Sequence, residues 1–279
     1  MGTIRGQFKQ VLLRLGRSPV FTVITLITLA AGIGANTAVF SVLEGVLLKP
    51  LPYPHSERLA AIRLTAPGIN VKDFELSPSD YFVFREQSTA FQDIGLYRDD
   101  SVSVTGEVQP ERVDALIVTD GMLPMLGIPP MLGRVFTKAD DSPGAPDTAV
   151  LTYGYWRRKF GGDGFVIGKT IVVDGKQRQI IGVMPQRFHF LDRSDPAILT
   201  PFQFDRNKTN LGNFSYQGVA RLKPGVTILQ VNADMARMLP IVMRSFEAPP
   251  GFSIKLFQDA RIGPNAKPLI AEVVGDIGK

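Results

Sequence analysis

SPVFTVITLITLAAGIGANTAVFSVL, residues 18–43, decides the architecture of this chain because it runs for 26 residues without a charged side chain. A helix of that length, at about 1.5 Å per residue, extends roughly 39 Å and exceeds a hydrocarbon core about 30 Å thick. A secretory signal peptide is the competing interpretation, although its apolar region spans only about 7–15 residues. A buried core helix is the third interpretation. We predict a retained transmembrane helix over residues 18–48.

The charges on either side of this helix predict its orientation. Residues 1–17 carry four basic side chains and no acidic one, namely Arg5, Lys9, Arg14 and Arg17. Basic residues flank the cytoplasmic end of membrane helices, so we expect a cytoplasmic N-terminus and an exported chain after about Leu48. Within residues 1–17, Phe8, Val11, Leu12 and Leu15 fall at helical spacing, which predicts a basic amphipathic segment on the inner leaflet or on a cytoplasmic partner.

The composition excludes several classes of function. The whole chain has 31 Lys+Arg and 26 Asp+Glu, so the residues after Arg17 hold 27 basic and 26 acidic side chains. This nearly neutral remainder argues against nucleic-acid binding, which needs basic residues gathered on a folded face. The absence of Cys rules out disulfides, thiolate metal sites and a Cys nucleophile.

Strand and helix patterns at the two ends of the exported part resemble each other. We predict a strand over 59–65, a helix from Pro78 to about Ser88 with Ser77 as N-cap, and strands over 94–97, 102–105 and 112–118. Near the C-terminus we predict a strand over 216–222, a helix over 227–244 and a strand over 252–258. These patterns form two strand-helix-strand units.

The region between these units has a different texture, with many Gly and Pro residues. We expect a strand over 148–151, an aromatic and basic helix over 153–160, and a hairpin of strands 170–173 and 177–184 around Asp174-Gly175. The fold class is therefore α+β. An inserted lobe at 119–213 divides a first subdomain into parts at 49–118 and 214–260, and residues 261–279 follow.

Few residues suggest chemistry. His55 and His189 lack the partners a metal site needs, and Asp140-Asp141 is interpreted as a solvated loop pair. Trp156 and Phe160, four residues apart, are expected to pack on one helix face while Arg157 and Arg158 point to water. No nucleophile-base set and no phosphate loop occurs. We predict no catalytic, cofactor-binding or metal-binding residues and no enzyme activity.

Six segments in order resemble the N-terminal half of MacB/FtsX-type ABC transporter permeases, with a MacB-like periplasmic core domain. They are Arg17–Thr22, Gly32–Ser41, Leu48–Tyr53, Tyr155–Gly162, Ile180–Pro185 and Ala220–Thr227. The resemblance implies a porter-like subdomain in two parts with an inserted lobe, in the bacterial inner membrane and periplasm. It also implies a cytoplasmic ABC ATPase partner, a permease homodimer and a periplasmic adaptor or envelope partner.

The resemblance also implies three further membrane helices after the core domain, so residues 261–279 are expected to lead toward a second one. The sequence is interpreted as a fragment of a longer permease or as a truncated gene product. Our leading hypothesis is a non-enzymatic permease piece that transmits ATP-driven movement across the bilayer for efflux or envelope transport. The alternative is a stand-alone, membrane-anchored periplasmic binding protein without an ATPase.

Overall fold

The computed structural model describes residues 19–47, 51–106, 110–191 and 196–277, so the basic segment at 1–17 lies outside the described residues. The chain divides into two compact units, residues 1–49 and 50–279. The first contains the helix α2 (Pro19–Leu47), whose described large apolar side chains from Val20 to Ile33 are exposed. Judged on described residues alone, no helix reaches the length and apolarity required to cross a membrane.

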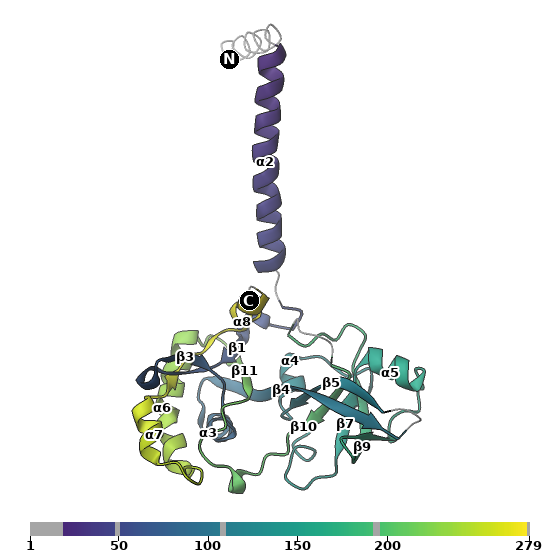
Figure 1. Ribbon diagram of the computed structural model, residues 1–279, viewed down its shortest axis with the longest axis vertical. Coiled ribbons are helices and arrows are strands. Elements are labelled where there is room, and N and C mark those ends of the chain that lie inside the picture. Colours follow the sequence, from purple (N-terminus) through teal and green to yellow (C-terminus); the bar gives the residue numbers. More distant parts are fainter. Residues whose placement is uncertain (1–18, 48–50, 107–109, 192–195, 278–279) are drawn as a thin grey trace. The chain divides into compact units, whose positions relative to one another are not determined.

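The second unit opens with the predicted strand-helix-strand pattern (Figure 1). The predicted first strand is broken into β1 (Leu59–Ile62) and β2 (Leu64–Ala66), and β3 (Val71–Phe74) pairs with β2. Helix α3 (Pro78–Gln87) begins where the sequence predicts. Ser77 accepts a hydrogen bond from the Asp80 amide while Asp80 accepts one from the Ser77 amide, a reciprocal capping box that satisfies two amides at the helix start.

A long mixed sheet organises this unit. Its strands lie in the order β13-β1-β11-β4-β5-β10-β7-β9-β6, with β8 pairing β4 and β9. The strands that build one end are β4 (Phe91–Thr105), β5 (Glu111–Val118), β11 (Gln217–Leu222) and β13 (Lys267–Pro268). The predicted strands 94–97 and 102–105 are thus one continuous strand, because β4 pairs along its length with β5, β11 and β8.

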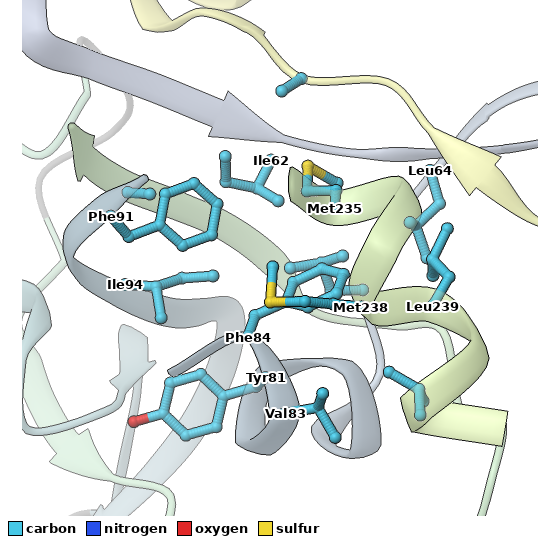
Figure 2. Packing of buried hydrophobic residues seen from close by; sticks show 14 of the residues in the cluster. Ile62, Leu64, Tyr81, Val83, Phe84, Phe91, Ile94, Met235, Met238 and Leu239 are labelled. Carbon is cyan, nitrogen blue, oxygen red and sulfur yellow. The ribbon is translucent and has the colours of Figure 1, made fainter. Parts of the chain in front are cut away.

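Both faces of this end of the sheet are covered by helices. Alternate residues of β1 point to opposite faces, so Ala60 and Ile62 join a core with α3 and α6 (Ile228–Ser245). Figure 2 shows Met235 and Met238 of α6 beside Phe84 of α3 in this core. On the opposite face a second core contains Leu59 and Ala61 together with α4 (Met122–Leu126) and α8 (Leu269–Ile277).

The middle of the chain forms the other end of the sheet. It consists of β6 (Leu132–Gly133), β7 (Thr148–Leu151), α5 (Tyr153–Phe160), β8 (Thr170–Val173), β9 (Lys176–Val183) and β10 (Ile198–Pro201). The predicted hairpin turn is confirmed, since Asp174 and Gly175 both have positive φ. Trp156 is buried and Phe160 is half-buried, while Arg157 and Arg158 are exposed, as expected.

The predicted strand at 252–258 is wrong. This segment contains the helix α7 (Ile254–Ala260), followed by the short strand β12 (Gly263–Pro264), which pairs with β2. The alternation of Phe252, Ile254 and Leu256 suggested a strand, yet all three are exposed. The buried residues of the segment are Phe257 and Ala260, three apart, which is helical spacing.

Candidate functional site

The residues that follow α2 in the sequence are bound firmly into the second unit. We call Leu51–Arg58 the stem; it ends in a short 3₁₀ turn, η1 (Ser56–Arg58). Leu51 and Tyr53 are buried. The Tyr53 hydroxyl donates to the His189 carbonyl at 2.8 Å and accepts from the Leu191 amide at 2.8 Å. A tyrosine near the start of the unit is thus held by a loop more than a hundred residues later.

A buried arginine of β11 holds the next part of the stem. The Arg221 guanidinium donates to the Pro54 carbonyl at 3.0 Å, to the His55 carbonyl at 3.1 Å and to the Met125 carbonyl at 2.7 and 2.9 Å. Burial lowers the pKa of Arg221. Backbone carbonyls are neutral, so this cation positions the stem and α4 without a buried ion pair.

The stem and α8 share one hydrophobic core. Leu51 and Tyr53 of the stem lie in the same buried cluster as Leu269 and Val273 of α8. Helix α8 also contacts β1, whose Leu59 belongs to this cluster. We call these buried residues, together with Arg221, the stem junction. Because interiors are close-packed, a displacement of the stem or of α8 would be felt by the sheet.

A second polar cluster ties α3 to the loop that follows β5. The Arg85 guanidinium donates to both carboxylate oxygens of Asp120, at 2.5 and 2.9 Å, and lies 3.9 Å from Asp93. The hydrogen bonds that Arg85 donates to Asp120 raise the pKa of Arg85, and burial raises the pKa of Asp93. This bidentate pair fixes α3 against residues at the start of the predicted inserted lobe.

The interpretation of Asp140-Asp141 as a solvated loop pair is wrong. Asp140 is buried and accepts from Arg134 at 2.6 and 2.9 Å and from Thr137, which together lower its pKa to about 2, the Arg134 bonds most of all. Asp141 accepts from the amides of Asp120 and Gln203, and burial raises its pKa to about 6. The two carboxylates organise loops, which sequence spacing alone did not reveal.

The remaining candidates have structural contacts. The exposed imidazole of His55 lies 3.5 Å from Glu57, and among described residues no group of three potential metal ligands occurs. Tyr155 donates to Glu111 at 2.9 Å and Trp156 donates to the Asp163 carbonyl at 3.0 Å. Both aromatic polar groups are therefore engaged inside the fold. Tyr53 and Arg221 lie within two of the segments that resemble the family, but no spacing pattern in the sequence predicted a role for either residue.

An open groove lies on the other face of the sheet end. It has a volume of about 510 Å³ and is lined by α6, α7 and the start of α3. Its apolar walls include Leu239, Met243 and Phe257, and its polar lining includes Asp80, Arg244 and Arg261. This volume lies within the range of about 300–1,000 Å³ that is common for ligand sites.

Comparisons with known proteins place this mixed α+β architecture among transporter permease domains. The family model of the MacB-like periplasmic core domain matches residues 22–238. The chain belongs to this family, whose members are components of ABC-type transporter permeases.

Two solved structures have the same fold. A domain described as coming from a permease protein of Porphyromonas gingivalis is 18% identical, with a TM-score of 0.55, and covers 77% of this chain and 92% of its own. The periplasmic region of MacB from Actinobacillus actinomycetemcomitans is 13% identical, with a TM-score of 0.53, and covers 79% of this chain and 94% of its own. No curated protein matches the chain.

Proposed function

We propose that this chain is a non-enzymatic permease component, anchored in the bacterial inner membrane, whose periplasmic domain transmits ATP-driven movement from a cytoplasmic ATPase. The stem junction carries the proposal. In it, the segment that follows α2 and the segment that leads to the end of the chain share one buried core, and Arg221 and Tyr53 fasten the stem to it. Movement applied to either segment would reach the sheet through packed side chains and hydrogen bonds.

We propose residues 18–48 as the membrane anchor, with the N-terminus in the cytoplasm. The proposal is supported by the uncharged stretch at 18–43 and by the helical conformation of Pro19–Leu47. A periplasm-specific reporter fused after Lys279 should be active in intact cells, and the same reporter fused after Arg17 should be silent. A silent Lys279 fusion, with the fusion protein present in the cells, would contradict this topology.

The porter-like parts at 49–118 and 214–260, the inserted lobe at 119–213 and a second membrane helix after 261–279 belong to the same proposal. So do a permease homodimer and a periplasmic adaptor or envelope partner. These assignments rest on the family resemblance, and the bidentate Arg85–Asp120 pair supports a fixed connection between the first part and the lobe.

Co-purification from the native host, with the complete gene product, tests the coupling. Recovery of an ATP-binding subunit is expected, together with ATP hydrolysis that depends on both proteins. The variant Tyr53→Phe should lower this coupled hydrolysis because the hydrogen bonds to His189 and Leu191 are lost. The matched control Tyr153→Phe alters a tyrosine of α5 outside the stem junction and should have no effect.

The stand-alone binding protein is the second candidate, and the open groove beside α6 and α7 is the observation that favours it. Consistent absence of an ATP-binding subunit from the purified protein would favour this candidate over the permease.

A further inference from the structure

From the groove between α6 and α7 we infer a binding site for a single-chain amphipathic carboxylate, a long-chain fatty acid. This site is separate from the stem junction and does not require an ATPase partner, so it extends the proposed function without resting on it. The groove occupies the outer side of the core that contains α3 and α6. Figure 1 shows α6 and α7 at the end of the second unit that also contains α3.

The apolar part of the lining suits an alkyl chain. It is made of Leu211, Phe214, Ala236, Leu239, Pro240, Val242, Met243, Phe257, Ile262 and Pro264. Burying a methylene group against such a wall is favourable by about 0.8 kcal/mol. Met243 adds a flexible side chain that adapts to chains of different shape.

The charged part of the lining selects an anion. Arg244, in the last turn of α6, and Arg261, directly after α7, both line the groove. Both residues are exposed, and no ion pair is found for either guanidinium within the part of the chain that the structure describes. Arginine binds carboxylates through paired donors, so either guanidinium of the lining offers a receptor for a head group.

Asp80 also lines the groove and does not cancel these charges. Its Oδ2 atom accepts from the Ser77 amide at 2.9 Å and from the Ser77 hydroxyl at 2.5 Å. Burial raises the pKa of Asp80 to about 6, so the carboxyl is neutral in mildly acidic conditions. The lining therefore carries two arginines and one carboxyl, which is already engaged in capping α3, and this balance favours a negatively charged ligand.

A close contact between backbones holds the end of α7, which lines the groove. A Cβ atom at Gly68 would lie 1.9 Å from the Asp259 carbonyl oxygen and 2.8 Å from the Ala260 carbonyl carbon. The turn η2 (Pro67–Ile69) therefore touches the end of α7 directly and sets the position of Arg261, the next residue. Glycine is required here because any side chain would push α7 away.

Photolabelling of the full-length protein in lipid nanodiscs tests the site. The probe is palmitate with a diazirine on its alkyl chain, and the labelled peptides are mapped by mass spectrometry. We expect label within residues 236–262, displaced by unlabelled palmitate and not by a cationic amphiphile of equal chain length. Label confined to α2, or equal displacement by the cation, would overturn the proposal.

Three variants sharpen the test. Ala236→Trp fills the groove from an exposed position of α6, and the double variant Arg244→Glu/Arg261→Glu reverses its charge. Each should reduce labelling at least about tenfold. The tryptophan occupies the space of the alkyl chain, and the charge reversal removes charge-assisted hydrogen bonds, whose loss has effects of this order on affinity. Lys255→Glu is the matched control, because Lys255 is an exposed cation of α7 outside the lining.

Labelling should be unchanged by the control, and circular dichroism should show that every variant is folded. Loss of labelling in Ala236→Trp alone, with the charge reversal silent, would mean an uncharged apolar ligand and would overturn the assignment of an anion. Unchanged labelling in Ala236→Trp would place the label outside the groove and would overturn the site itself.

Discussion

The stem junction and the groove lie on opposite faces of one sheet, and they treat charged groups in opposite ways. In the junction, the buried Arg221 guanidinium donates hydrogen bonds to backbone carbonyls of the stem and α4. In the groove, Arg244 and Arg261 line an open space of about 510 Å³. A close-packed cluster whose polar groups are all hydrogen-bonded resists deformation. An open surface with two arginines can still bind a ligand.

The different pairing of polar groups in the junction and in the groove suits two different requirements of a transporter component. A force-transmitting connection must stay closed in every state, and its groups must be paired within the protein. A binding surface must exchange its partners, and it keeps part of its polar groups for the ligand. The four changes that follow probe one side of this comparison or the other, from the largest expected loss of stability to an expected gain.

Arg221→Met should destabilise the second unit most. The change removes the hydrogen bonds that Arg221 donates to the carbonyls of Pro54, His55 and Met125, of which those to Met125 are buried, and an unsatisfied buried acceptor costs about 1–3 kcal/mol. We expect a loss of about 4 kcal/mol in the free energy of unfolding. Urea unfolding followed by the fluorescence of Trp156, the sole tryptophan, measures it.

Arg187→Met is the matched control for this change. Arg187 is exposed, and surface substitutions alter stability by about 0.5 kcal/mol or less. Equal losses in the two variants would mean that the hydrogen bonds of Arg221 do not hold the junction closed.

Gly68→Ala should cause the next largest loss and should act on the groove side. The added Cβ would meet the Asp259 carbonyl oxygen at 1.9 Å, and overpacking of this kind costs typically about 1–3 kcal/mol. Amide hydrogen exchange in α7 should accelerate, while exchange in α8 should be unchanged. Gly154→Ala, at an open position of α5, is the control. Faster exchange in α8 would show that the two faces are not independent.

Arg221 and Gly68 illustrate which features of the fold could be predicted from the sequence and which could not. Local signals predicted α3, α5, α6 and the β8–β9 hairpin, because caps, turn dipeptides and periodic apolar residues act within a few positions. Arg221 and Gly68 act on partners nearly a hundred residues away or more. No local spacing encodes such contacts, so no role for either residue could be predicted from the sequence.

The prediction for 252–258 failed for a related reason. Phe252, Ile254 and Leu256 alternate as in a half-buried strand, but no neighbouring strand buries them. The helix α7 is held instead by Phe257 and Ala260 and by contact with η2. Tertiary packing therefore decided between two conformations that the local pattern left close in energy. The groove depends on this outcome, because Phe257 and Gln258 of α7 and the following Arg261 form part of its lining.

Asp234→Asn should lower the free energy of unfolding by about 2 kcal/mol, and this difference from the wild type should vanish in strong acid. Asp234 of α6 accepts from the amides of Thr89 and Ala90 at 2.8 and 3.1 Å, and from Ser88 and Arg237. Despite burial, these bonds lower its pKa to about 2 from 3.8. The stability it contributes is therefore present above pH about 4 and lost as the pH falls through about 2.

Unfolding free energies of the wild type and of Asp234→Asn, measured from pH 2 to pH 6, test this dependence. The two curves should converge toward pH 2. Asp140→Asn should behave similarly, because Arg134 holds the pKa of Asp140 at about 2. Parallel curves over the whole range would mean that the charge of Asp234 does not stabilise the packing of α6 on the sheet.

Asp80→Asn should act with the opposite sign and raise stability above pH 6, by up to about 3 kcal/mol. Because burial raises the pKa of Asp80 from 3.8 to about 6, the folded state keeps a proton that the unfolded state has lost. Wild-type stability should thus fall as the pH rises from about 4 to 6 and then level off. Asparagine retains the acceptor for Ser77 and removes this decline, so the variant should be the more stable protein above pH 6. Asp141→Asn, at the other carboxyl whose pKa is raised to about 6, should remove a separate part of the same decline. A decline that persists unchanged in Asp80→Asn would show that this carboxyl is already charged below pH 6 in the folded protein, and the groove lining would then hold an anion as well as its two arginines over the whole range.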